Sequence, residues 1–220
     1  MIVKDFIRYD CPVARPQNTP EEVLEMMCDY KISQIPYVDE SDYLALLDEL
    51  VVSEMESGEP LQKQVKANYL NPYSIEDQHL LEVVSLFGHN NIMLLPVVDT
   101  QKNYTGVLMA EDVTMALGSL FSFHREGAVI VLETTPYDYS LSQIAQIVES
   151  SDAKIVQLFV NESGNKDALE VIIRVDQTMV HRMLQTFYRY NYTIKSVFSS
   201  TENAEDLKER YGLFMKYLDV

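Results

Sequence analysis

The residue types that most often carry chemistry are sparse in this chain and do not cluster. The histidines have no histidine or cysteine neighbours at the spacing of a metal site. They are His79, His89, His124 and His181. Cys11 and Cys28 form no C-x-x-C pair, and the sequence holds no G-x-S-x-G, P-loop or G-x-G-x-x-G motif. We therefore expect no metal site, no required cofactor and no enzyme activity.

The groups that remain for chemistry are two carboxylates at the start of an expected helix. Gly106 begins a short apolar run that ends at Met109, and Glu111 and Asp112 follow almost directly. An acidic residue in the first turn of a helix stabilises the free backbone N–H groups and the positive end of the helix dipole. From the residues alone, Asp112 either caps this helix or contacts a ligand.

The elements that position Asp112 occur twice in the chain. Residues 92–98 form an apolar run that contains Pro96, and residues 32–38 repeat it sixty positions earlier around Pro36. Each run predicts a buried strand that leads through a turn into a second strand and a helix. The turn between the two strands has three more residues in the second copy than in the first. Beyond this turn we therefore expect equivalent residues of the two copies to lie sixty-three positions apart, which aligns Glu49 with Asp112. Two copies favour a closed pseudo-symmetric pair.

The remainder of the chain predicts a different unit. We expect the first repeat at 1–57 and the second at 67–120, joined by a polar linker. Residues 127–200 give the order βαββαβ, which is typical of the ferredoxin-like split βαβ arrangement. Residues 201–220 predict an amphipathic terminal helix.

Composition limits the partners. The net charge is −17 and the sequence pI is about 4.5, whereas nucleic acids and anionic membrane surfaces attract basic proteins. The N-terminus lacks the apolar core of a signal peptide, and no apolar run approaches the roughly 20 residues of a membrane span. With only two cysteines, these observations predict a cytoplasmic protein with no nucleic acid or membrane partner.

The repeat resembles a tandem pair of CBS domains over roughly residues 1–120. In each copy a helix precedes an apolar-Pro-apolar-apolar-Asp strand and a second apolar strand that leads into an acidic helix start. The third unit is similar to an ACT-like domain in its order of elements, and the whole arrangement is similar to acetoin-utilisation accessory proteins. This resemblance implies an α/β (α+β) fold with pseudo-twofold symmetry, a regulatory role and a homodimer with a regulated protein partner.

The resemblance also implies a ligand site. CBS pairs commonly hold an adenine nucleotide or adenosyl compound, such as AMP, ATP or S-adenosylmethionine, in the cleft between the copies. Their ribose contact is the last residue of Gly-apolar-apolar-Ser/Thr-x-x-Asp, which becomes Gly106 to Asp112 here with Met109 in place of the hydroxyl residue. The residues implied at this site are Asp112, Gly106 and Val107, with Leu95 and Pro96 or their partners Ile35 and Pro36 as apolar walls for the base.

The first copy departs from this pattern, and so does the third unit. Tyr43 stands where the family has its glycine, so we expect only the site at Asp112 to bind a ligand. The loop 134–140 lacks the glycine of amino-acid-binding ACT domains and carries Tyr137 and Tyr139, which could instead contact a second subunit. The alternative function is a structural or partner-binding protein that has lost its ligand and uses the CBS pair only as a dimerisation interface.

Overall fold

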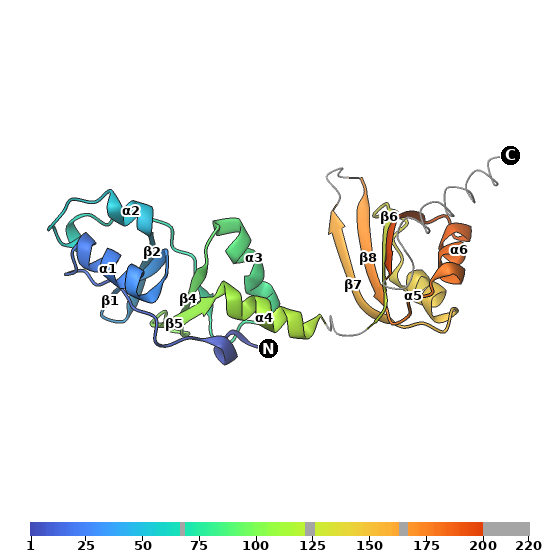
Figure 1. Ribbon diagram of the computed structural model, residues 1–220, viewed down its shortest axis with the longest axis horizontal. Coiled ribbons are helices and arrows are strands. Elements are labelled where there is room, and N and C mark those ends of the chain that lie inside the picture. Colours follow the sequence, from blue (N-terminus) through green and yellow to red (C-terminus); the bar gives the residue numbers. More distant parts are fainter. Residues whose placement is uncertain (67–68, 122–125, 163–166, 200–220) are drawn as a thin grey trace. The chain divides into compact units, whose positions relative to one another are not determined.

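The chain folds into two compact units, Met1–Leu120 and Phe121–Val220 (Figure 1). The computed structural model describes residues 1–66, 69–121, 126–162 and 167–199. The terminal helix expected at 201–220 lies outside the described residues.

The first unit contains two copies of a helix, two paired strands and a closing helix. Its elements are η1 (Val3–Phe6), α1 (Pro20–Tyr30), β1 (Gln34–Asp39), β2 (Asp42–Asp48), α2 (Glu49–Ser53), η2 (Leu61–Lys63), β3 (Ser74–Ile75), α3 (Leu80–Asn90), β4 (Leu94–Val98), β5 (Tyr104–Met109) and α4 (Ala110–Leu120). Strand β1 pairs with β2, and β4 pairs with β5 and with β3. The repeat expected from the sequence is present in the structure.

Equivalent local signals form the first helix of each copy. Thr19 and Glu22 make a capping box at the start of α1, and the His79 side chain accepts a hydrogen bond at the start of α3. Both helices end at a residue in the left-handed conformation, Lys31 with φ of 54° and Asn91 with φ of 52°. Because the caps agree in position, both helices enter the following strand in the same way.

Strand register corrects the expected alignment of the two copies. Pro36 pairs with Leu46 and Pro96 pairs with Val107, so the offset after the turn is sixty-one and not sixty-three. Asp112 therefore corresponds to Val51, and not to Glu49. The sequence comparison overestimated the length difference, because the loop between the paired Val98 and Tyr104 is only one residue longer than the loop between the paired Val38 and Tyr43.

Segments that precede one repeat complete the other. Arg8 and Val107 exchange two backbone hydrogen bonds of 2.8 and 3.0 Å, and Val3 and Ile7 are buried in the core of the second repeat. In the opposite direction, the Leu46 N–H donates to the carbonyl of Leu70 at 2.9 Å. The first eight residues thus pack on the second repeat, although they lie in the sequence before the first.

The two repeats also meet directly. The Met93 N–H donates to the Gln34 side chain at 2.9 Å, and the Tyr104 N–H donates to the carbonyl of Ser41 at 2.7 Å. Val38 and Val98, at equivalent positions of the two copies, belong to one small buried cluster at this junction. Burial of apolar side chains from both copies joins them into a single unit.

The second unit is a four-stranded antiparallel sheet with two helices. Its elements are β6 (Ala128–Thr134), α5 (Leu141–Glu149), β7 (Ile155–Glu162), β8 (Leu169–Val175), α6 (His181–Arg189) and β9 (Thr193–Ser199), with strand order β7-β8-β6-β9. Side chains of α5, α6 and the sheet share one core, which includes Ile130, Ile144 and Phe187. The order and pairing confirm the ferredoxin-like βαββαβ arrangement.

The other face of this sheet carries apolar side chains as well. Phe159, Ile172 and Val131 lie opposite one another on β7, β8 and β6. Successive side chains of a strand alternate between faces, which separates this row from the core residues Ile130 and Ile173. Phe159 is 43% exposed.

Candidate functional site

Asp112 lies in the first turn of α4 and forms a bidentate ion pair with Arg8. The Arg8 Nε donates to Asp112 Oδ2 at 2.6 Å, and its Nη2 donates to Oδ1 at 2.8 Å. The same Nη2 donates to Glu111 Oε1 at 2.6 Å. Two carboxylates and one guanidinium thus form a charged cluster at the N-terminus of the closing helix.

Backbone pairing places Arg8 in this cluster. Because Arg8 pairs with Val107 on β5, its side chain lies close to the helix that follows that strand. Gly106 makes the pairing fit, since a Cβ atom there would lie 2.5 Å from Ile7 Cγ2 and 2.6 Å from the Arg8 carbonyl oxygen. In this structure Gly106 is therefore needed for contact with the N-terminal segment.

The charged cluster is only partly shielded from water. The side chain of Asp112 is 18% exposed and that of Arg8 is 42% exposed. Hydrogen bonds and charge attraction from Asp112, and then from Glu111, raise the pKa of Arg8, although its desolvation acts in the opposite direction. The guanidinium is cationic in any case at neutral pH, so it is a suitable partner for a carboxylate or a phosphate.

The apolar residues expected at the site fill the cores of the two repeats. Leu95 and Val107 are fully buried in the second repeat, and Ile35 is fully buried in the first. Pro96 lies opposite Val107 on β4, and Pro36 occupies the corresponding place on β1; both prolines are buried. The structure brings Asp112, Gly106 and Val107 together near Arg8, while Ile35 belongs to a separate core cluster.

Tyr43 lies at the junction of the repeats. It is 9% exposed, and its hydroxyl donates to the carbonyl of Pro72 at 3.0 Å. Register places Tyr104 at the corresponding position of the second copy. Burial raises the pKa of both tyrosines, so each hydroxyl is protonated at neutral pH. In the first copy, the residue that corresponds to Gly106 is Ala45, whereas the sequence alignment had predicted Tyr43.

The described residues provide neither a cluster of metal ligands nor a helix that could span a membrane. No group of three or more histidine, cysteine, aspartate or glutamate side chains within 1–66, 69–121, 126–162 and 167–199 could hold a metal ion. Among the helices in these ranges, none is both long and apolar enough to cross a membrane.

Comparison with known proteins identifies the fold of the first unit. The family model for the CBS domain matches residues 75–119. A CBS domain pair/ACT domain protein from Thermotoga maritima has a similar structure, with a TM-score of 0.50 and 20% identity over 54% of this chain and 98% of that chain. The first unit has the fold of a CBS-domain pair.

Other structures with CBS domains were found at lower similarity. CBSX2 in complex with AMP matches with a TM-score of 0.46 and 18% identity, over 54% of this chain and 97% of that chain. The CBS domain of a bacterial CNNM/CorC family Mg²⁺ transporter in complex with ATP matches with a TM-score of 0.44 and 16% identity, over 54% of this chain and 87% of that chain. A search of curated proteins found no match.

Arg8 is the residue of this CBS pair that sequence reasoning did not identify. It lies 104 positions before Asp112, in a short segment with no motif of its own. Only the pairing of the N-terminal segment with β5 reveals the contact. Gly106 is the sign of this contact in the sequence, because a residue without a Cβ atom is required where two backbones approach this closely.

Proposed function

We propose that this protein is a regulatory protein whose CBS pair senses an adenine nucleotide or adenosyl ligand near Asp112. The observation that carries the proposal is the cluster of Asp112 and Arg8 at the start of α4 in a CBS-pair fold. Asp112 would accept hydrogen bonds from the ribose hydroxyls, and Arg8 would turn to a phosphate group. The residues Gly106, Val107, Leu95, Pro96, Ile35 and Pro36 remain part of the proposed site.

Ligand binding would act by a shift of populations. A ligand that binds one arrangement of the two repeats better than another favours that arrangement, and the attached unit responds to the change. We further propose that the second unit is ACT-like, that the protein is a cytoplasmic homodimer, and that the arrangement corresponds to acetoin-utilisation accessory proteins. The proposed bounds are 1–57 and 67–120 for the repeats and 127–200 for the ACT-like domain.

Thermal unfolding with AMP, ADP, ATP and S-adenosylmethionine at millimolar concentration tests this proposal. At about a hundred times its dissociation constant a ligand adds ~2.7 kcal/mol to stability, which raises the melting temperature measurably. We expect Asp112→Asn to abolish the response. Glu49→Gln, at the first turn of α2, is the matched control and should respond as the unmodified protein does.

The variant Arg8→Ala separates the two roles within the cluster. If Arg8 binds phosphate, Arg8→Ala weakens the binding of AMP and ATP more than the binding of adenosine. Equal weakening of all three ligands would contradict the phosphate role. A melting temperature that none of the ligands changes would contradict the sensor itself.

One observation favours the alternative, a partner-binding protein without a ligand. Both carboxylate oxygens of Asp112 already accept hydrogen bonds from Arg8, and the space beside Gly106 is filled by Ile7 and Arg8. In this case Asp112→Asn changes the stability of the protein, and no nucleotide changes the melting temperature of either form.

A further inference from the structure

The helices that close the two copies, α2 and α4, begin at equivalent residues (Figure 1). The Glu49 N–H donates to the carbonyl of Ser33 at 2.9 Å, and the Ala110 N–H donates to the carbonyl of Met93 at 2.9 Å. The offset of sixty-one between the second strands of the copies therefore continues into both helices. Residues 111 and 112 of the second copy correspond to residues 50 and 51 of the first.

The segments that enter the two copies are equivalent as well. The Val107 N–H donates to the carbonyl of Arg8 at 3.0 Å, and the Leu46 N–H donates to the carbonyl of Leu70 at 2.9 Å. Leu46 and Val107 occupy the same position of their hairpins. Leu70 is therefore the counterpart of Arg8.

An apolar patch stands in the first copy where the second has its charged cluster. The apolar patch consists of the three counterparts of Arg8, Glu111 and Asp112, namely Leu70, Leu50 and Val51. Leu50 is 75% exposed and Leu70 is 48% exposed. Single exposed apolar side chains are common, but these occupy positions whose counterparts touch one another. The first copy thus presents apolar surface at the place where the second presents two carboxylates.

Carboxylates surround the apolar patch. The Asp48 side chain caps α2 and accepts a hydrogen bond from the Leu50 N–H at 3.0 Å. Glu54 lies four residues after Leu50 and is exposed. Among the described residues, neither carboxylate has a basic partner within an ion pair. Residues 20–59 contain twelve aspartate or glutamate residues and one lysine, whereas residues 80–120 contain four and one.

This charge restricts what can cover the apolar patch. In a symmetric contact, a second copy of the chain would bring its own Asp48 and Glu54 against the same carboxylates. Nucleic acid and anionic membranes would be repelled in the same way. A protein segment that carries lysine or arginine beside apolar side chains complements both the leucines and the carboxylates.

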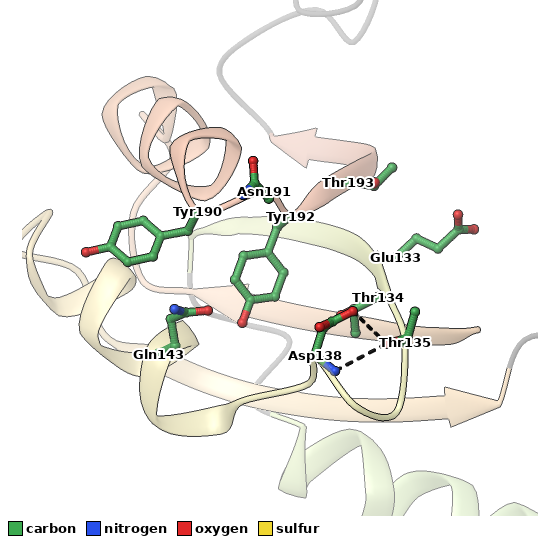
Figure 2. Close-up of a pocket in the computed structure, with 9 residues that line it drawn as sticks. All are labelled: Glu133, Thr134, Thr135, Asp138, Gln143, Tyr190, Asn191, Tyr192 and Thr193. Carbon is green, nitrogen blue, oxygen red and sulfur yellow. Dashed lines mark hydrogen bonds between the residues drawn. The ribbon is translucent and has the colours of Figure 1, made fainter. Parts of the chain in front are cut away.

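The cavity of the second unit does not offer such a surface. Its volume is about 390 Å³, and Figure 2 shows mainly polar side chains around it, among them Glu133, Asp138 and Gln143. Protein interfaces are anchored by apolar, aromatic and arginine side chains in desolvated surroundings. The exposed leucines of the first copy suit this role better than the polar cavity does.

We propose that the apolar patch docks the protein that this chain regulates, through a segment with a row of apolar side chains flanked by lysine or arginine. This inference rests on the regulatory function proposed above, to which it adds the place and the chemistry of the partner contact. The ligand site and the docking site then lie at equivalent positions of the two copies.

Fluorescence anisotropy of a labelled peptide, titrated with the full chain at about 150 mM salt, tests the proposal. The probe carries leucine at every third or fourth position and lysine elsewhere, so that a helix presents one apolar face. In one control peptide serine replaces leucine, and in the other glutamate replaces lysine. We expect micromolar binding of the probe, about tenfold weaker binding of the serine peptide, and no binding of the glutamate peptide.

The double variant Leu50→Gln, Leu70→Gln removes apolar surface at exposed positions, so the fold should tolerate it. We expect it to bind the probe about tenfold more weakly. Leu81→Gln, at a leucine that is 52% exposed on α3 of the second copy, is the matched control and should bind normally.

Unchanged affinity in the double variant, an equal loss in Leu81→Gln, or equal binding of the serine peptide would each overturn the proposal. A change from dimer to monomer in the double variant, measured by light scattering, would also overturn it, because the patch would then be covered by a second copy. The melting temperature with nucleotides separates the two proposals. A nucleotide response without probe binding removes the docking site alone, whereas probe binding without a nucleotide response removes the sensor alone.

Discussion

Gly106 is the residue at which the N-terminal segment approaches β5 most closely. We expect Gly106→Ala to lower the free energy of unfolding by about 1–3 kcal/mol, because the new Cβ atom would meet Ile7 and the Arg8 backbone. Urea unfolding measures this change. Gly118 lies on α4 with open space around it, so Gly118→Ala should instead raise the free energy of unfolding by about 0.5–1 kcal/mol. Equal effects of the two variants would contradict the close approach.

The two cysteines should differ in reactivity. Burial raises the pKa of the Cys11 thiol to about 11, whereas Cys28 is exposed. Because the thiolate reacts, modification of Cys11 should be slow at pH 8 and should accelerate about tenfold per pH unit towards pH 11. Reaction of Cys28→Ser with a thiol reagent, followed by mass spectrometry, isolates this slow phase. Fast modification at pH 8 would contradict the burial.

At this scale the sequence predicted the carboxylate but not its partner. Asp112 could be located because its helix start repeats a pattern, whereas Arg8 gains its role from a contact 104 positions away along the chain. The close approach at Gly106 likewise depends on a segment about a hundred residues away.

The exchanged N-terminal segment makes a prediction at the scale of an element. Val3 is fully buried in the second repeat, so Val3→Ala should destabilise it by about 2 kcal/mol. Hydrogen exchange at the Val107 amide, which donates to Arg8, should accelerate more than exchange within β1 and β2. Ile2→Ala, at a position 36% exposed, is the control. Faster exchange in β1 alone would contradict this packing.

The elements themselves could be predicted from the sequence more fully than their alignment. Capping residues such as Thr19 and Ser140 mark helix starts, and apolar runs mark the buried strands. The offset between repeats was wrong because the residue types do not show which residues of the two strands pair across each turn. The pairing of the first eight residues with β5 also lay beyond local patterns.

The proposed dimer belongs to the scale of the whole molecule. The sheet face that carries the partly exposed Phe159 is a candidate interface, so we expect Phe159→Glu to convert a dimer of twice the 25.3 kDa chain mass into a monomer. Light scattering after size-exclusion chromatography measures this mass. Tyr137→Glu changes a side chain that is 98% exposed in the loop 134–140. This variant tests that loop as the interface, and we expect it to leave the dimer intact. The reverse result would place the interface at the loop.

The exchange of segments between the repeats has a consequence for how the chain acquires its structure. Arg8 leaves the ribosome long before its strand partner Val107, so the first residues must wait for about a hundred more to be synthesised. Contacts this distant along the chain slow folding, because a large loop must close before they form. The second copy can therefore complete its sheet only after β5 has been synthesised, and the first eight residues have no strand partner until then.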